Sequence, residues 1–204
     1  MDFPRLALAT SAAGPDPSIA ALAMLAGLTE RRLRVQHFRS VACPTTTESV
    51  GQATGLPGRH LDAWLMPCAV QENLFARGAR HADLAIVEGT LDEGAFVGEW
   101  ETSCDKPGLL RPIAESLDLP IIAVVSCRSW NGVDGVSHLP RIPTGAEAVL
   151  VDDLEDQASL EPIRRLIRLC TGRPVIGAVN SLGVIRQQFQ EAPRHGTLPE
   201  ESIR

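Results

Sequence analysis

The chain has 204 residues, of which 44% are hydrophobic and 22% charged, and its net charge is −6. This length allows one well-buried core, and the composition is ordinary for a globular domain. No apolar run reaches the roughly 18 residues that a membrane span requires. The amino terminus lacks a signal-peptide pattern and the basic residues do not cluster, so neither a membrane nor a nucleic acid is an expected partner.

Short apolar runs alternate with helical patterns along the whole chain. In chain order we expect a strand at residues 5–10, a helix at 18–28, a strand at 33–38, a Thr-rich loop, a helix at 61–80 interrupted at Pro67, a strand at 82–89, an irregular loop at 94–108, a helix at 109–117, strands at 120–125 and 148–151, a helix at 160–170 and a strand at 174–179. The strand at 33–38 alternates in polarity and is expected to be half covered. This order predicts an α/β fold, a doubly wound and mainly parallel sheet with helices on both faces. Residues 1–189 are expected to form one domain and residues 190–204 a polar C-terminal tail or linker.

The five cysteines are scattered, with no C-x-x-C pair and no histidine at metal-ligand spacing. They are Cys43, Cys68, Cys104, Cys127 and Cys170. Such a set favours reduced, half-buried packing residues over disulfides or a zinc site. We therefore expect a cytoplasmic protein.

Several stretches of the chain together resemble a known family. Residues 37–39, 53–66, 74–77 and 85–89 follow one another in an order that resembles the ATP-binding domain of cobyrinic acid a,c-diamide synthases, relatives of dethiobiotin synthetase. The most specific part is the Thr-Gly…Leu-Asp-x-Trp-x-Met pattern within residues 54–66, and the likeness covers most of the chain. The resemblance implies a P-loop NTPase-like fold.

The loop after the first strand departs from the pattern of that family. Members use G-T-x-S-G-x-G-K-[ST]-T, and here its lysine falls on Asp16, the preceding glycine on Pro15, and the hydroxyl residue that holds Mg²⁺ on Pro17. Only Thr10 and Ser18 keep their residue type. Proline has no N–H to offer a phosphate, and Asp16 reverses the charge of the lysine. We therefore predict a degenerate Walker A loop that does not hold ATP.

Three further residues are carried over from the resemblance. Glu88 ends a strand where relatives polarise metal or substrate, and it is the only catalytic or metal candidate; the alternative is an acid that is simply solvated. Arg39 keeps the charge of a family lysine, although the aspartates and histidine of that stretch are missing. Asp62 lies in the most specific part of the likeness. With Thr10 and Ser18, Arg39 and Asp62 are the candidate ligand-binding residues.

Other residues are expected to be structural. Trp64 is interpreted as a core aromatic. The position of the base-recognising residues in relatives falls on Asp152 and Asp153, which suggests a solvated strand end. The five histidines are spread singly, without an evident partner.

Two functions follow from these observations. The first is a non-catalytic binding or scaffold protein that kept the sheet and lost ATP binding, with a protein partner or a homodimer and no cofactor. The second is an ATP-dependent amidoligase of cobalamin biosynthesis, which activates a substrate carboxylate with ATP and Mg²⁺. The pattern of retained strands and replaced loop residues favours the first, and we expect the chain not to be an enzyme.

Overall fold

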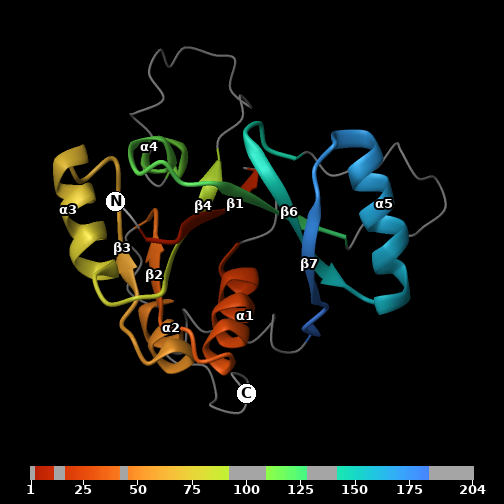
Figure 1. Cartoon of the computed structure of the whole chain (residues 1–204), viewed down its shortest axis with the longest axis horizontal. Helices are drawn as coiled ribbons and strands as arrows, with labels where there is room; N and C mark the ends of the chain where they lie inside the picture. Colours follow the sequence, from red (N-terminus) through yellow and green to blue (C-terminus); the bar gives the residue numbers. More distant parts are fainter. Residues whose placement is uncertain (1–2, 12–16, 42–45, 92–108, 128–141, 184–204) are drawn as a thin grey trace.

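A seven-stranded parallel sheet forms the centre of the molecule, as the computed structural model shows (Figure 1). The structure describes residues 3–11, 17–41, 46–91, 109–127 and 142–183. The strand order is β3-β2-β4-β1-β5-β6-β7. The chain builds one side of β1 first and then the other, so the carboxyl end of β1 is the topological switch point where such sheets bind ligands.

The elements follow one another as alternating strands and helices. They are β1 (Arg5–Ser11), α1 (Pro17–Glu30), β2 (Val35–Arg39), α2 (Thr46–Thr54), β3 (Arg59–His60), α3 (Cys68–Ala79), β4 (Leu84–Leu91), α4 (Arg111–Ser116), β5 (Ile121–Ser126), β6 (Ala146–Leu154), a 3₁₀ turn at Gln157–Ser159, α5 (Leu160–Thr171) and β7 (Val175–Asn180). The predicted doubly wound fold is confirmed. The predicted loop at 94–108 and the tail at 190–204 lie outside the described residues, so the predicted domain limits stay a prediction.

Helices cover both faces of the sheet because successive strand residues point to opposite faces. On one face, Leu8 and Ile86 pack against Leu25 of α1. On the other, Phe38 packs against Phe75 of α3 with ring centroids 4.9 Å apart. The helix α5 covers β5 and β6 on this second face, through residues such as Ile167.

The structure corrects three expectations about local structure. Residues 46–54 form the helix α2 where a Thr-rich loop was expected, and Arg59–His60 form a two-residue edge strand. Residues 61–67 are not helical, because the Asp62 carboxylate accepts hydrogen bonds from the N–H groups of Trp64 and Leu65 and so forms a turn. The helix restarts after Pro67, as predicted.

The strand β2 is more covered than its alternating polarity suggested. Gln36 and His37 are both 3% exposed, because β2 lies between β3 and β4 and helices cover both faces. The Gln36 side-chain amide donates to the carbonyl oxygens of His37 and Pro57. Polar residues in this strand are therefore core residues.

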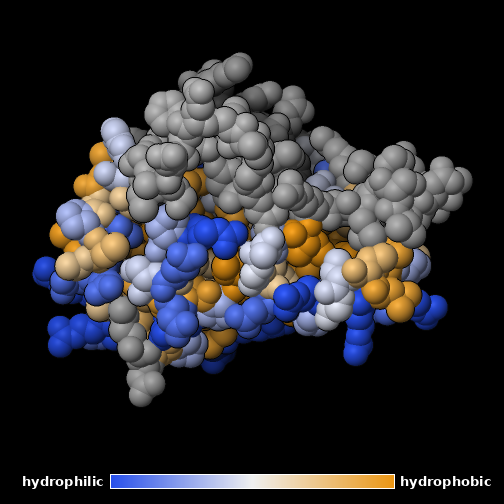
Figure 2. Space-filling view, turned by 90° about the horizontal axis from the view of Figure 1, so that it is seen from above, coloured by the Kyte–Doolittle hydropathy of each residue, from blue (hydrophilic) through white to orange (hydrophobic). Residues whose placement is uncertain are grey.

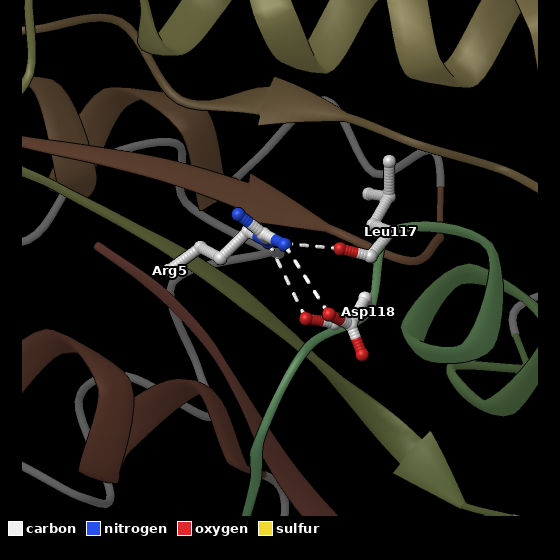
Figure 3. Close-up of polar contacts among 3 residues, drawn as sticks. All are labelled: Arg5, Leu117 and Asp118. Carbon is white, nitrogen blue, oxygen red and sulfur yellow. Dashed lines mark hydrogen bonds and ion pairs between the residues drawn. The ribbon is translucent and has the colours of Figure 1, made fainter. Parts of the chain in front are cut away.

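Arg5 ties the start of β1 to the turn before β5 (Figure 3). Its Nε donates to the carbonyl oxygen of Leu117 at 2.9 Å, and its guanidinium lies 3.5 Å from the carboxylate of Asp118. The carboxylate is almost fully exposed, so this ion pair adds little, while the bond to the carbonyl fixes the turn. Asp118 itself has φ of 49°, in the left-handed region.

The surface of the described part is mixed. In the view of Figure 2, hydrophobic residues emerge in separate places between hydrophilic ones. Within the described residues, no helix is both long enough and apolar enough to span a membrane.

Gly89 is a position where any side chain is excluded. A Cβ there would lie 2.1 Å from Ser40 Oγ and 3.1 Å from Leu110 Cβ. We expect Gly89→Ala to lower stability by about 1–3 kcal/mol, measured by thermal or denaturant unfolding. Gly27→Ala is the matched control, because nothing lies within 4 Å of its added Cβ. Equal unfolding midpoints for the two variants would contradict the tight packing at Gly89.

Candidate functional site

A row of polar residues crosses three neighbouring strands near their carboxyl ends. In the parallel register, His60 of β3 lies opposite Arg39 of β2, and Arg39 lies opposite Glu88 of β4. Opposed residues in a sheet point to the same face, so these three side chains form one row. His37 precedes Arg39 by two residues and shares this face, which is the one covered by α1.

Glu88 is the centre of this row and is 1% exposed. Its Oε1 lies 3.1 Å from Nε of Arg39, and its Oε2 lies 3.3 Å from Nε2 of His37. The interpretation of Glu88 as a solvated strand-end acid is therefore wrong. A carboxylate buried this deeply requires a compensating cation, and Arg39 supplies it, since a guanidinium stays charged at any physiological pH.

His60 is part of this row and His37 lies 3.3 Å from Glu88, although the sequence suggested no partner for either. Both ring nitrogens of His37 are buried, and neither makes a hydrogen bond within the described part of the chain. His60 Nδ1 lies 3.0 Å from the carbonyl oxygen of Val41, which makes Nδ1 the protonated nitrogen when the ring is neutral. Burial lowers the pKa of His60, with a smaller contribution from the charge of Arg39. The contacts of both histidines follow from the register of β2 with β3 and β4. That register is known only once the strands are paired, so the sequence did not reveal it.

The two retained hydroxyl residues lie on either side of the predicted phosphate loop. Thr10 is near the end of β1, is 1% exposed and pairs with Thr90 of β4. It is two positions after Leu8, which lies opposite Glu88, so Thr10 shares the face of the row one pleat further on. Ser18 is in the first turn of α1, and its side chain is outside the described part, as are residues 12–16.

Asp62 is 3% exposed and is engaged in its own turn, as described above. Its carboxylate therefore has a structural role. The neighbouring Trp64 is 59% exposed, which contradicts its interpretation as a core aromatic. The turn that Asp62 caps directs residue 64 away from the hydrophobic interior.

A second polar group lies at the end of β6. Asp152 is fully buried and Asp153 is 5% exposed, so the expected solvated strand end is wrong. Asp153 has φ of 60°, at an irregularity in the pairing of β6 with β7. The adjacent thiol of Cys127 is buried, and burial, followed by the charges of Asp152 and Asp153, raises its pKa to about 12.

The described residues contain neither a metal-binding cluster nor a disulfide bond. Among them, no group of three or more His, Cys, Asp or Glu side chains is placed to hold a metal ion. Cys68, Cys127 and Cys170 are free thiols there, the first and last exposed and Cys127 buried. None of these three is half-buried, so that expectation is wrong for them, and Cys43 and Cys104 lie outside the described residues.

The parallel sheet with its switch point at β1, and the buried acid Glu88 within β4, define a P-loop NTPase-like α/β domain. Solved structures agree. The signal recognition particle 54 kDa protein from Aeropyrum pernix in complex with GDP gives a TM-score of 0.54 at 15% identity, over 90% of this chain and 43% of that one. Chloroplast FtsY from Physcomitrella patens gives 0.55 at 12% identity, over 100% and 64%. At these identities the likeness shows the fold alone.

Sequence comparisons point to a more particular likeness. The chain is 33% identical to hydrogenobyrinate a,c-diamide synthase of Streptomyces coelicolor over 131 residues, which are 63% of this chain and 26% of the relative. It is 26% identical to cobyrinate a,c-diamide synthase of Salmonella typhimurium over 178 residues, which are 84% of this chain and 38% of the relative. The corresponding enzyme of Thermoplasma acidophilum is 23% identical over 87% of this chain and 40% of its own.

The resemblance to cobyrinic acid a,c-diamide synthases is thereby confirmed. No family model matches the chain. The chain spans about a quarter to two fifths of the length of these curated relatives.

The burial and raised pKa of Cys127 should make its thiol react more slowly than those of Cys68 and Cys170. A thiol with a raised pKa carries little thiolate at pH 7.5, and burial hinders access of a reagent. We expect iodoacetamide to label Cys68 and Cys170 at least tenfold faster than Cys127 in the folded chain, as measured by peptide mass spectrometry. Denaturation should remove this difference. Fast labelling of Cys127 in the folded chain would contradict its burial.

Proposed function

We propose that this chain is a cobyrinic acid a,c-diamide synthase-like domain that does not bind Mg·ATP and acts as a non-catalytic binding or scaffold protein. The observation that carries the proposal is the state of Glu88, the acid at the predicted metal position. Its two carboxylate oxygens face Arg39 at 3.1 Å and His37 at 3.3 Å, inside the protein. A magnesium ion would have to displace the guanidinium of Arg39, whose side chain is 17% exposed, to reach it.

The sequence of the loop between β1 and α1 supports the proposal independently. Pro15 and Pro17 remove two N–H groups from a loop that binds phosphate through such groups. Asp16 stands in the position of the lysine, so an attraction to phosphate becomes a repulsion. One charge pair at about 4 Å amounts to roughly 1–4 kcal/mol at water-like to surface-like dielectric, and the reversal doubles the change.

The exposed apolar residues between β3 and the start of α3 suit a protein partner or a second copy of the chain. Three large apolar side chains are exposed within seven consecutive residues: Trp64 at 59%, Leu65 at 56% and Val70 at 44%. Exposed aromatic and aliphatic residues that gather on one segment are typical of protein-binding surfaces. We place the protein in the cytoplasm, in keeping with the scattered free thiols.

The second candidate is an ATP-dependent amidoligase that activates a carboxylate with ATP and Mg²⁺. It is favoured by the names of the relatives, which are synthases, and by the presence of the acid Glu88 in β4. On this function Arg39 would have to leave Glu88 when Mg·ATP binds. The two functions therefore differ in nucleotide affinity.

Calorimetric titration of the purified chain with Mg·ATP, together with a thermal-shift scan of nucleotides, tests the proposal. We expect no binding heat and no shift in Tm at millimolar Mg·ATP. A variant with Pro15→Gly, Asp16→Lys and Pro17→Thr restores the N–H groups, the cation and the hydroxyl, and should bind ATP at least tenfold more tightly than the wild type. Micromolar binding by the wild-type chain would overturn the proposal in favour of the amidoligase.

A further inference from the structure

The residues at the predicted metal position do not fit a bound divalent cation as they stand. Glu88 has a cation, Arg39, beside one oxygen and the His37 ring beside the other, and its side chain is 2% exposed. Arg39 cannot lose its charge, so a divalent ion would meet like charge in a buried space. The ion pair with Arg39 compensates the charge of Glu88 without a metal.

We propose that Arg39 is a resident cation in place of the metal, and that it blocks a latent divalent-metal site formed by Glu88 and His37. This inference deepens the proposed function and rests on it, because it gives a reason why Glu88 does not hold a metal ion. Arg39 lies directly opposite Glu88 in the register of β2 and β4, so its side chain starts from the adjacent strand on the same face. Removal of its charge leaves a buried carboxylate without that compensation.

His37 supplies the second donor of the latent site. It is 3% exposed, and neither ring nitrogen has a hydrogen-bond partner within the described ranges. A buried polar group without a hydrogen bond is costly, and a neutral imidazole nitrogen is a good metal ligand. The approach to Glu88 is close enough for an ion pair but lacks hydrogen-bond geometry.

The separation of the two donor atoms matches a shared metal ion. Ligands at about 2.0–2.1 Å from an ion are roughly 3.0 Å apart in octahedral geometry and roughly 3.4 Å apart in tetrahedral geometry. His37 Nε2 and Glu88 Oε2 are 3.3 Å apart. One imidazole and one carboxylate suit Mn²⁺ or Zn²⁺ better than Mg²⁺, which prefers oxygen ligands alone, and water would complete the coordination.

The experiment compares Mn²⁺ binding by the wild type and by Arg39→Met, which keeps an apolar stem and removes the charge. Binding is measured by the electron paramagnetic resonance of free Mn²⁺ and by the Mn²⁺-dependent shift in Tm. We expect Arg39→Met to have a lower Tm than the wild type in the absence of metal. Saturating Mn²⁺, at about a hundred times Kd, should raise its Tm by roughly 5 °C or more, and the wild-type Tm by less than about 1 °C.

Two double variants show whether the proposed residues hold the ion. Adding Glu88→Gln to Arg39→Met should abolish Mn²⁺ binding, and adding His37→Ala should weaken it at least tenfold. Arg39→Lys keeps a cation and should behave as the wild type.

The proposal is overturned if folded Arg39→Met does not bind Mn²⁺, or if Glu88→Gln leaves its binding unchanged. If Arg39→Met does not fold without metal, two measurements replace the comparison. Mn²⁺ binding by the wild type that Glu88→Gln abolishes would overturn the proposal, because Arg39 would then be no barrier. No Mn²⁺ binding by the wild type, together with folding of Arg39→Met when Mn²⁺ is added, would support the latent site. Mg·ATP binding by the wild type would refute the proposed function separately, because the Mn²⁺ titrations contain no nucleotide.

Discussion

A buried carboxylate has to be neutralised, and the neutralisation of Glu88 by Arg39 is the interaction on which the polar side of this sheet depends. Breaking a buried ion pair by removing one partner costs about 3–5 kcal/mol, because the remaining charge has no solvent. Arg39 and Glu88 meet because β2 and β4 pair in one register, which also brings His37 and His60 to the same face. The alignment of β3, β2 and β4 therefore decides which side chains surround Glu88.

The same position can serve catalysis or structure, depending on which cation stands beside the acid. In a P-loop NTPase-like sheet, the carboxyl ends around β1 are where ligands bind, so an acid in the second half of the neighbouring strand β4 is suited to a metal. Here a cation from the neighbouring strand stands beside that acid, and Asp16 stands where the resemblance places the lysine of the loop after β1. On the function proposed above, both differences make the joint binding of a metal and a triphosphate less favourable. Fold alone does not decide between these uses.

The fold was largely predictable because its signals are local. The apolar run at 82–89 predicts a buried parallel strand, and it became β4. The helix α2 was missed because its Thr residues have low helix propensity, and β3 because two residues carry no periodicity. Residues 61–67 carried an apolar pattern that favoured a helix, but the carboxylate of Asp62 holds a turn there instead. For β3 the pairing with β2, and for residues 61–67 the bond of Asp62, outweighed the local pattern.

The sequence by itself determined the fold class and the resemblance to cobyrinic acid a,c-diamide synthases, and it put Pro15, Asp16 and Pro17 in the loop after β1, because these depend on residue type and order. Only the tertiary structure decided that Glu88 is buried against Arg39, that His37 lies 3.3 Å from it, and that Trp64 is exposed. Burial and pairing depend on which strands are neighbours and on which helices cover them. Residues far apart in the chain make those contacts, and no local pattern of residues specifies them.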